Sequence, residues 1–104
     1  YVNLEEAGYL MQTRFDDAPQ AANALRARGA ARVLVTDGGR TAADCGPQGL
    51  CTADPPQVLV TRVTGAGDTF MAAHIAAESR GEAPKDALVH ALRTAADYVS
   101  GDVE

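Results

Sequence analysis

The sequence has little of what nucleic-acid binders and membrane proteins require. Nine Lys and Arg stand against 14 Asp and Glu, a formal net charge of −5, so the chain lacks the basic excess that phosphate backbones and anionic lipid surfaces attract. Tryptophan is absent, aromatic residues make up 5% of the chain, and no apolar run approaches the roughly 18 residues of a membrane span. We therefore expect neither a nucleic-acid partner nor a membrane partner.

Cysteine and histidine are also scarce. Cys45 and Cys51 flank a short Gly- and Pro-containing segment and form no CxxC pair, while His74 and His90 lie far apart. This set is too small for a zinc site, and two cysteines are too few for a disulfide scaffold. A strained hairpin disulfide is one alternative. We favour two free thiols on facing strands of a reduced, cytoplasmic protein.

What is present is an ordinary globular balance in a short chain. The 104 residues are 46% apolar and 22% charged, which allows one domain or part of one. The first residue is Tyr1, and no signal-like segment follows it. We expect residues 1–104 to be a single partial domain.

Local patterns in the first third predict two helices and a buried strand. Asn3 is a good N-cap, and Glu6 completes a capping box for a helix that starts at residue 4. A second helix has Pro19 in its first turn and ends at Gly29. The run 32–36 is short, apolar and β-branched, as in a strand buried on both faces, and the helix before it makes this half of a βαβ unit.

The remaining residues predict a hairpin, a strand and two helices. Residues 40–45 and 50–53 flank a Gly-Pro-Gln-Gly turn, and 58–60 is a short strand after two prolines. Helices are expected from about Asp68 to Arg80 and from Pro84 onward. The last one has the clearest amphipathic stripe: Ala87, Leu88, Ala91, Leu92, Ala95, Ala96 and Val99.

The segment Val63–Phe70 carries the strongest chemical signal. Two glycines separated by alanine lead directly into a helix, so successive N–H groups can point together at its positive end and bind an anion. An acid there fits if Asp68 takes the proton of a neutral hydroxyl while the amides hold a transferring phosphoryl group. The alternative is a glycine-rich turn in which Asp68 is an ordinary first-turn acid. The segment is neither a GxxxxGK[ST] loop nor a complete dinucleotide fingerprint, since Phe70 stands where a third glycine would be.

Thr64-Gly65-Ala66-Gly67-Asp68-Thr69-Phe70 resembles the C-terminal signature of the ribokinase-like, or PfkB, carbohydrate and nucleoside kinases. Asn3-Leu4-Glu5-Glu6 is similar to the family's N-x-x-E element, and Val35-Thr36-Asp37-Gly38-Gly39 to its strand-end T-x-G. The resemblance covers nearly the whole chain but only about the last third of such a kinase. It implies an α/β fold: the C-terminal portion of a three-layer α/β/α architecture with a mostly parallel central sheet and a β-hairpin.

The resemblance also implies roles for individual residues. Asp68 would be the catalytic base, and the amides of Gly65, Ala66 and Gly67 would form the anion hole for the γ-phosphoryl group of ATP. Thr36, Gly38, Thr64 and Asn3 would line the nucleotide. Asn3 and Glu6 would help to hold Mg²⁺, although the same two residues also satisfy a capping box with no further function.

One departure from the family pattern bears on the substrate. Many members have an acid two residues before the signature threonine, where this chain has Arg62. That makes the segment more similar to pseudouridine kinases, so pseudouridine is the favoured acceptor, with ribose, adenosine and a phosphorylated hexose left open.

Three hypotheses follow from the resemblance. The first is a kinase of which this chain is the ATP side. The second, which we favour for the 104 residues alone, is a nucleotide-binding fragment without turnover, because sugar-gripping residues and any dimer-forming lid would precede Tyr1. The third is a degenerate relative, which the intact Gly-Ala-Gly-Asp element disfavours.

Overall fold

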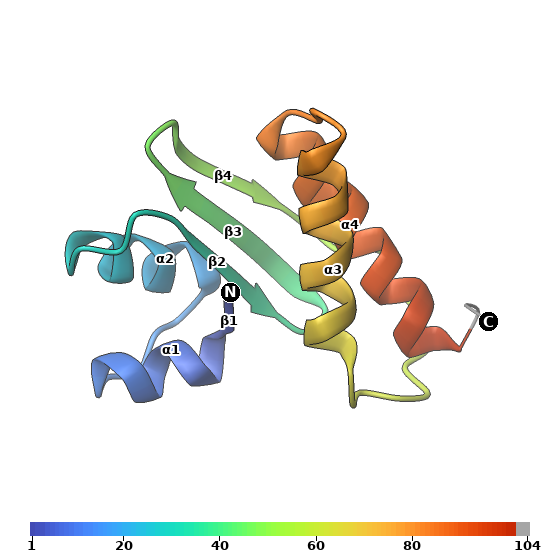
Figure 1. Cartoon of the computed structure of the whole chain (residues 1–104). Coiled ribbons are helices and arrows are strands. Elements are labelled where there is room, and N and C mark those ends of the chain that lie inside the picture. Colours follow the sequence, from blue (N-terminus) through green and yellow to red (C-terminus); the bar gives the residue numbers. More distant parts are fainter. Residues whose placement is uncertain (102–104) are drawn as a thin grey trace. The chain divides into compact units, whose positions relative to one another are not determined.

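The computed structural model describes residues 1–101 and confirms the α/β fold class. The chain divides into two compact units, Tyr1–Ala53 and Asp54–Glu104. The first contains all of the strands and two helices, and the second contains two long helices (Figure 1). None of the helices in residues 1–101 is long and apolar enough to cross a membrane.

The first unit is a four-stranded sheet with two helices. The sheet has the order β1-β2-β3-β4, and β1 is parallel to β2 while the other two pairs are antiparallel. The elements are β1 (Val2–Asn3), α1 (Leu4–Met11), α2 (Ala18–Ala27), β2 (Val33–Asp37), β3 (Arg40–Gly46) and β4 (Gly49–Ala53).

The connections explain which predictions about the sheet hold. Two helices join β1 to the parallel β2, which confirms the half βαβ unit, and β3 and β4 form the predicted hairpin. Within residues 1–101 the sheet is mixed, with one parallel and two antiparallel strand pairs. Tight turns follow β2 and β3, and a tight turn can join only antiparallel strands, whereas a parallel neighbour needs a long crossover.

The predicted strand at 58–60 is wrong. Residues 54–63 have no regular secondary structure, and Leu59 is 82% exposed. A strand exists only with a partner edge, and no strand in the described part of the chain pairs with this segment.

Small side chains dominate the core of the first unit. Val33, Leu34 and Val35 are all buried, as predicted for a strand covered on both faces. Alanines of α2 pack against β2 and β3, where their lack of bulk lets the helix approach closely. The buried cluster consists of Ala7, Ala18, Ala21, Ala22, Val33, Val35, Ala43 and Cys45.

Both thiols are free, as predicted. In the β3–β4 ladder Cys45 is opposite Leu50, and Cys51 is opposite Asp44. Directly opposed residues share a face, so the two cysteines, one register step apart, point to opposite faces. The pairing register therefore rules out the hairpin disulfide.

The second unit is a pair of helices, α3 (Ala66–Ser79) and α4 (Pro84–Ser100), packed side by side (Figure 1). Helix α4 begins with proline as expected, and Ala87, Leu88, Ala91, Leu92 and Ala96 of its predicted stripe are buried. Helix α3 begins at Ala66, two residues earlier than predicted, so the glycine motif lies within its first turn.

Candidate functional site

The glycine motif forms the turn that starts α3. Gly65 is the N-cap residue with φ of 91°, a left-handed conformation that glycine adopts without steric cost, and no side chain caps this helix end. The first intrahelical bond runs from the Thr69 amide to the Gly65 carbonyl at 2.9 Å. The amides before Thr69 have no acceptor inside the helix, so those that find none in the preceding turn are available to an external acceptor at its positive end.

The available amides differ in part from those predicted. The Ala66 amide donates to the Val63 carbonyl at 3.0 Å and is already occupied. Among the described residues, the amides of Gly67 and Asp68 have no protein acceptor. Of the three amides predicted to form the anion hole, those of Gly65 and Gly67 have no acceptor within residues 1–101, and the Asp68 amide, which was not predicted, is free as well.

The Asp68 carboxylate is exposed on the first turn of α3. Within residues 1–101 its side chain forms no hydrogen bond and no ion pair, so it does not cap its own helix. A free carboxylate beside free amides can accept a proton from a bound hydroxyl while those amides face an anion.

Tyr98 also belongs to this site, and sequence reasoning missed it. Its hydroxyl donates to the Thr64 carbonyl at 2.6 Å, across 34 residues of sequence. A Cβ added to Gly65 would lie 2.6 Å from the same hydroxyl oxygen. The only available signal was that Tyr98 is the one tyrosine of α4, which does not identify its partner.

The other predicted residues lie in the first unit, at the carboxyl edge of two strands. Asn3 ends β1 and is the register partner of Thr36 on the parallel strand β2. Gly38, with φ of 56°, lies in the turn that follows β2. Three residues expected to border the nucleotide are therefore brought together at one edge, where ligands of parallel strands commonly bind.

Asn3 and Glu6 form the predicted capping box. The Glu6 amide donates to Asn3 Oδ1 at 2.8 Å, and the Asn3 amide donates to Glu6 Oε1 at 2.9 Å. Glu6 Oε2 has no protein partner within the described chain, and both side chains are exposed. One carboxylate oxygen of Glu6 therefore remains for Mg²⁺ or for a water molecule bound to it. A carboxylate oxygen is the kind of ligand that a hard cation such as Mg²⁺ prefers.

A cavity of about 600 Å³ opens beside α1 in the first unit. It is lined by α1, the segment 13–16, and the residues on either side of the Gly38-Gly39 turn, Asp37 and Arg40. These two form an ion pair at 3.6 Å, and Asp37 Oδ2 is buried without a hydrogen bond. Asn3, Thr36 and Gly38 are not among its lining residues, so the cavity adjoins the predicted nucleotide edge without containing it.

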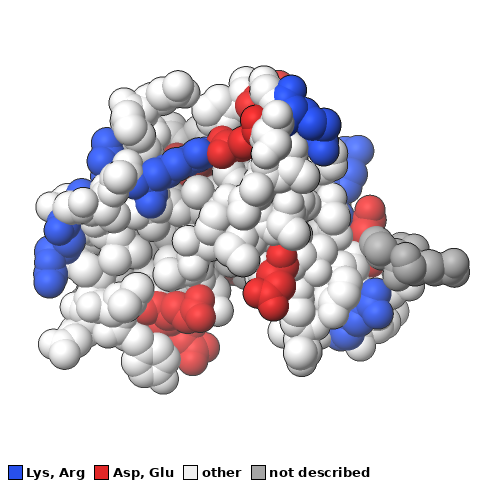
Figure 2. All heavy atoms as spheres, in the orientation of Figure 1, with Lys and Arg blue, Asp and Glu red and all other residues white. Residues whose placement is uncertain are grey.

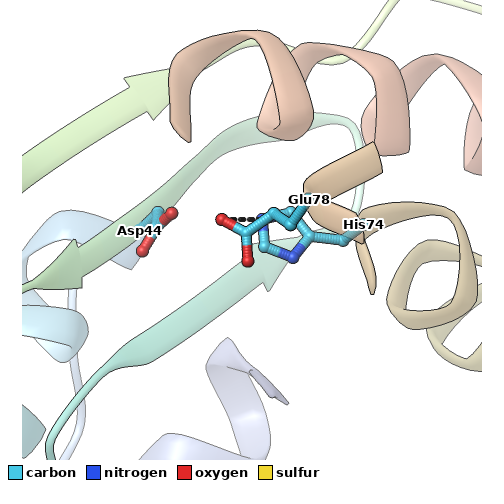
Figure 3. Close-up of side chains that lie close together, drawn as sticks. All are labelled: Asp44, His74 and Glu78. Carbon is cyan, nitrogen blue, oxygen red and sulfur yellow. Dashed lines mark ion pairs between the residues drawn. The ribbon is translucent and has the colours of Figure 1, made fainter. Parts of the chain in front are cut away.

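Two buried polar side chains have structural partners. On α3, His74 is fully buried, stacks on Phe70, and places Nε2 3.9 Å from Glu78 Oε2 (Figure 3). On β3, Asp44, labelled in the same figure, accepts two hydrogen bonds from Arg32, at 3.0 Å from Nε and 2.6 Å from Nη2. Arg32 satisfies the Asp44 carboxylate within the first unit, whereas Nε2 of His74 is buried and makes no hydrogen bond within residues 1–101.

The surface has no concentrated positive charge on the face drawn. Figure 2 shows Lys and Arg scattered among Asp and Glu, without a continuous basic patch.

Comparison with known proteins gives one family and one fold. The family described as pfkB family carbohydrate kinase matches residues 1–100. The PfkB protein of Polaromonas sp. JS666 is 26% identical with a TM-score of 0.78, covering 96% of this chain and 31% of that protein. Ribokinase of Thermotoga maritima is 25% identical with a TM-score of 0.82, covering 94% of this chain and 34% of that protein.

Aminoimidazole riboside kinase of Salmonella enterica, at 24% identity and a TM-score of 0.78, shows the same fold. No curated protein sequence matches the chain. The chain spans about a third of the length of the solved structures it resembles. Because the family match extends over nearly all of its residues, this chain belongs to the pfkB family of carbohydrate kinases.

Proposed function

We propose that the protein containing this chain is an ATP-dependent kinase that phosphorylates a hydroxyl group of a sugar or nucleoside. The observation that carries the proposal is the start of α3. There, the exposed and unpartnered carboxylate of Asp68 adjoins the free amides of Gly67 and Asp68. Phosphoryl transfer passes through a loose transition state, so orientation and charge stabilisation provide most of the catalysis, and these groups supply both.

Asp68 is the base in this proposal. It accepts the proton of the acceptor hydroxyl as the oxygen attacks the γ-phosphorus; the bond from that phosphorus to the β–γ bridging oxygen breaks, and ADP leaves. The amides of Gly67 and Asp68 donate to the phosphoryl oxygens, with the Gly65 amide beside them. The Ala66 amide joins them only if it leaves the Val63 carbonyl, because that 3.0 Å bond occupies it.

The nucleotide and the metal ion belong with the remaining predicted residues. Thr36, Gly38 and Asn3 border the ATP at the edge of β1 and β2, and Thr64 borders it at the turn before α3. Glu6, through its free oxygen, and Asn3 help to hold Mg²⁺ through water. When bound, Mg²⁺ supplies neutralisation of the charge on the phosphates.

Pseudouridine is the favoured acceptor, with ribose, adenosine and a phosphorylated hexose as alternatives. The support is Arg62, which occupies a position where many relatives carry an acid. In this structure its guanidinium lies over the Tyr98 ring, 4.1 Å from the centroid, and is committed to α4. This contact identifies no acceptor.

Residues 1–104 are proposed to be the ATP-side part of a single kinase domain. The relatives are about three times as long, and a kinase cleft needs a wall for the acceptor as well as for ATP. The alternative for the isolated chain is a nucleotide-binding fragment without turnover. Clear phosphorylation by the isolated chain with ATP and Mg²⁺ would exclude that alternative.

The deciding experiment is a phosphorylation screen of the protein containing this chain with pseudouridine, ribose, adenosine and fructose 6-phosphate. Asp68→Asn should lower kcat by about 10²–10⁴, the usual loss for a general base, with ATP affinity largely retained. Asp86→Asn is the matched control. Asp86 is also an exposed acid in the third position of a helix, α4, and should leave kcat unchanged. Equal kcat for wild type and Asp68→Asn would remove the base assignment.

A further inference from the structure

The turn that carries the glycine motif is held by the end of a helix that is distant in sequence. Tyr98, in the last turn of α4, donates its hydroxyl hydrogen to the Thr64 carbonyl at 2.6 Å. Its ring edge also fills the space above Gly65, where an added Cβ would lie 3.2 Å from Tyr98 Cζ. One side chain therefore fixes both residues that immediately precede α3.

Arg62 holds Tyr98 in place. Its guanidinium stacks on the Tyr98 ring at 4.1 Å, and its Nε donates to the Tyr98 carbonyl at 2.6 Å. The stacking is a cation–π contact, and the planar guanidinium suits it better than an ammonium group would. Arg62 thus holds both the backbone and the ring of the residue that contacts Thr64.

The end of α4 explains why this arrangement is favourable. The last turn of α4 contains no basic residue, although a helix C-terminus carries partial negative charge and unpaired carbonyls. The amides of Thr61 and Arg62 donate to the Val99 carbonyl at 2.6 and 3.1 Å, and the Thr61 hydroxyl donates to it at 3.0 Å. The segment 61–62 therefore caps α4, and Arg62 provides the positive charge that the last turn of α4 lacks.

We propose that Tyr98 and Arg62 are positioning residues for phosphoryl transfer. They hold Thr64 and Gly65 against α4, so that the amides of Gly67 and Asp68 and the Asp68 carboxylate keep one orientation. The inference rests on the proposed kinase function. The C-terminal end of α4 sets the geometry of the phosphoryl site through the Tyr98 hydroxyl and through the Arg62 guanidinium that stacks on the Tyr98 ring.

A purely stabilising role would also use these contacts, so the test separates the two. Tyr98→Phe removes only the bond to Thr64 and keeps the ring under Arg62. Arg62→Lys keeps the positive charge but loses the planar stack, and Arg62→Ala loses both. Tyr9→Phe is the matched control, since Tyr9 is 77% exposed on α1 and its hydroxyl has no partner among the described residues.

Two measurements on the protein containing this chain give the answer. The first is steady-state kinetics with the acceptor identified by the screen. The second, which needs no ligand, is hydrogen exchange of the Ala66 and Thr69 amides, whose acceptors, Val63 and Gly65, lie in the held turn. The Ala87 amide, bonded to Ala83 at the far end of α4, reports general loosening.

For Tyr98→Phe we expect kcat to fall roughly tenfold, the value of one neutral hydrogen bond, with the acceptor KM unchanged. Exchange at Ala66 and Thr69 should rise by a similar factor while Ala87 is unaffected. Arg62→Ala should act in the same direction, and Arg62→Lys should recover only part of the loss. Tyr9→Phe should match wild type in both measurements.

Two results would overturn the proposal: wild-type kcat and exchange in Tyr98→Phe, or exchange that rises as much at Ala87 as at Ala66. Absence of kinase activity in wild type would instead refute the proposed function. In that case faster exchange at Ala66 and Thr69 in Tyr98→Phe would still show that Tyr98 holds the turn. Unchanged exchange in this variant would show that Tyr98 does not hold it.

Discussion

Gly65 is subject to two independent constraints at the start of α3. Its φ of 91° lies in the left-handed region, where an L side chain costs roughly 1–2 kcal/mol. An added Cβ would also lie only 2.6 Å from the Tyr98 hydroxyl oxygen. Gly67, two residues on, has neither constraint, because it lies inside the helix with no atom within 4 Å of an added Cβ.

We therefore predict opposite effects of alanine at the two glycines. Gly65→Ala should lower the free energy of unfolding by at least about 1–2 kcal/mol, since backbone strain and the clash with Tyr98 add. Gly67→Ala should raise it by up to about 1 kcal/mol through helix propensity. Denaturant unfolding of the two variants beside wild type measures both changes.

The double variant Gly65→Ala, Tyr98→Phe separates strain from clash. Removing the hydroxyl should relieve part of the cost, so the two changes should be non-additive by a measurable amount. Equal stability of Gly65→Ala and wild type would contradict both the turn geometry and the Tyr98 contact.

The sequence located the residues of the motif but not their partners. Asp68 and the glycines are recognisable because the signature is a continuous run of seven residues. The occupied Ala66 amide depends on the local path of the turn, and the Tyr98–Thr64 bond spans 34 residues. A contact of that separation follows from how α3 and α4 pack, which periodicity alone does not specify.

Among the helices and strands, the features set by residues close together in sequence were predictable. The capping box at Asn3 and Glu6 needs only residues three apart, and the βαβ half and hairpin follow from short turns. The strand predicted at 58–60 was wrong because a run of apolar residues forms a strand only where the edge of another strand is available to pair with it. The sequence of the run itself does not show whether such an edge is present.

The α1 cap allows its structural and functional roles to be separated. Glu6→Gln keeps a side-chain oxygen for the Asn3 amide, because glutamine also forms capping boxes, so the unfolding free energy should change little. The change removes the charge proposed to help hold Mg²⁺, so the Mg²⁺ concentration needed for half-maximal activity should rise. Asn3→Ala, which breaks the cap, should cost about 1 kcal/mol.

Magnesium titrations of kinase activity and denaturant unfolding of the same two variants check this prediction. An unchanged Mg²⁺ requirement in Glu6→Gln would leave Glu6 with its capping role alone.

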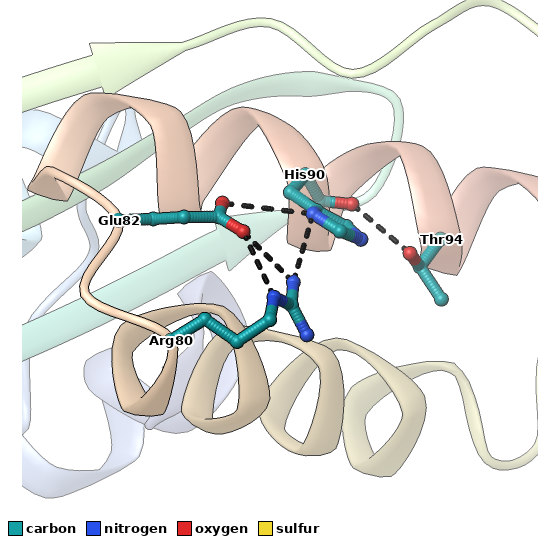
Figure 4. A network of polar contacts seen from close by, with 4 residues as sticks. All are labelled: Arg80, Glu82, His90 and Thr94. Atoms are coloured by element: carbon teal, nitrogen blue, oxygen red, sulfur yellow. Dashed lines mark hydrogen bonds and ion pairs between the residues drawn. The ribbon is translucent and has the colours of Figure 1, made fainter.

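The connection between α3 and α4 carries a polar network that should respond to acid. Glu82 accepts hydrogen bonds from Arg80 at 2.8 and 3.2 Å and lies 3.6 Å from His90 Nδ1 (Figure 4). The hydrogen bond from Arg80 holds the pKa of Glu82 below its usual 4.5, and the positive charges of Arg80 and His90 add to this effect, while desolvation opposes it. The network therefore favours the ionised carboxylate in the folded chain.

The sign of the pH dependence follows from that lowered pKa. The contribution of Glu82 to stability is complete above about pH 4.5 and is lost as the pH falls through the lower folded-state pKa. On acidification below pH 4.5, the melting temperature of Glu82→Gln should therefore fall less than that of wild type. Glu5→Gln, an exposed acid on α1, should behave as wild type; identical acid profiles of wild type and Glu82→Gln would contradict the network's role.

At the scale of the whole chain, apolar burial is limited. The core of the first unit is mostly alanine, whose methyl groups contribute little transfer free energy each. Larger apolar side chains remain at the surface, including Leu59 at 82% exposure, Tyr9 at 77% and Val63 at 72%. A chain of about this size buries only about 60–68% of its unfolded surface, which leaves a narrow margin over conformational entropy.

We therefore predict that the isolated 104-residue chain melts without a sharp cooperative transition. Helices α3 and α4 should retain secondary structure over a broad temperature range, because local contacts dominate in the second unit, whereas the sheet of the first unit ends in the two-residue strand β1. Far-UV circular dichroism reports the helices and tyrosine fluorescence reports packing, so the two curves should not coincide. Coincident, steep transitions in both signals would show that the 104 residues fold as one cooperative unit and would contradict the prediction.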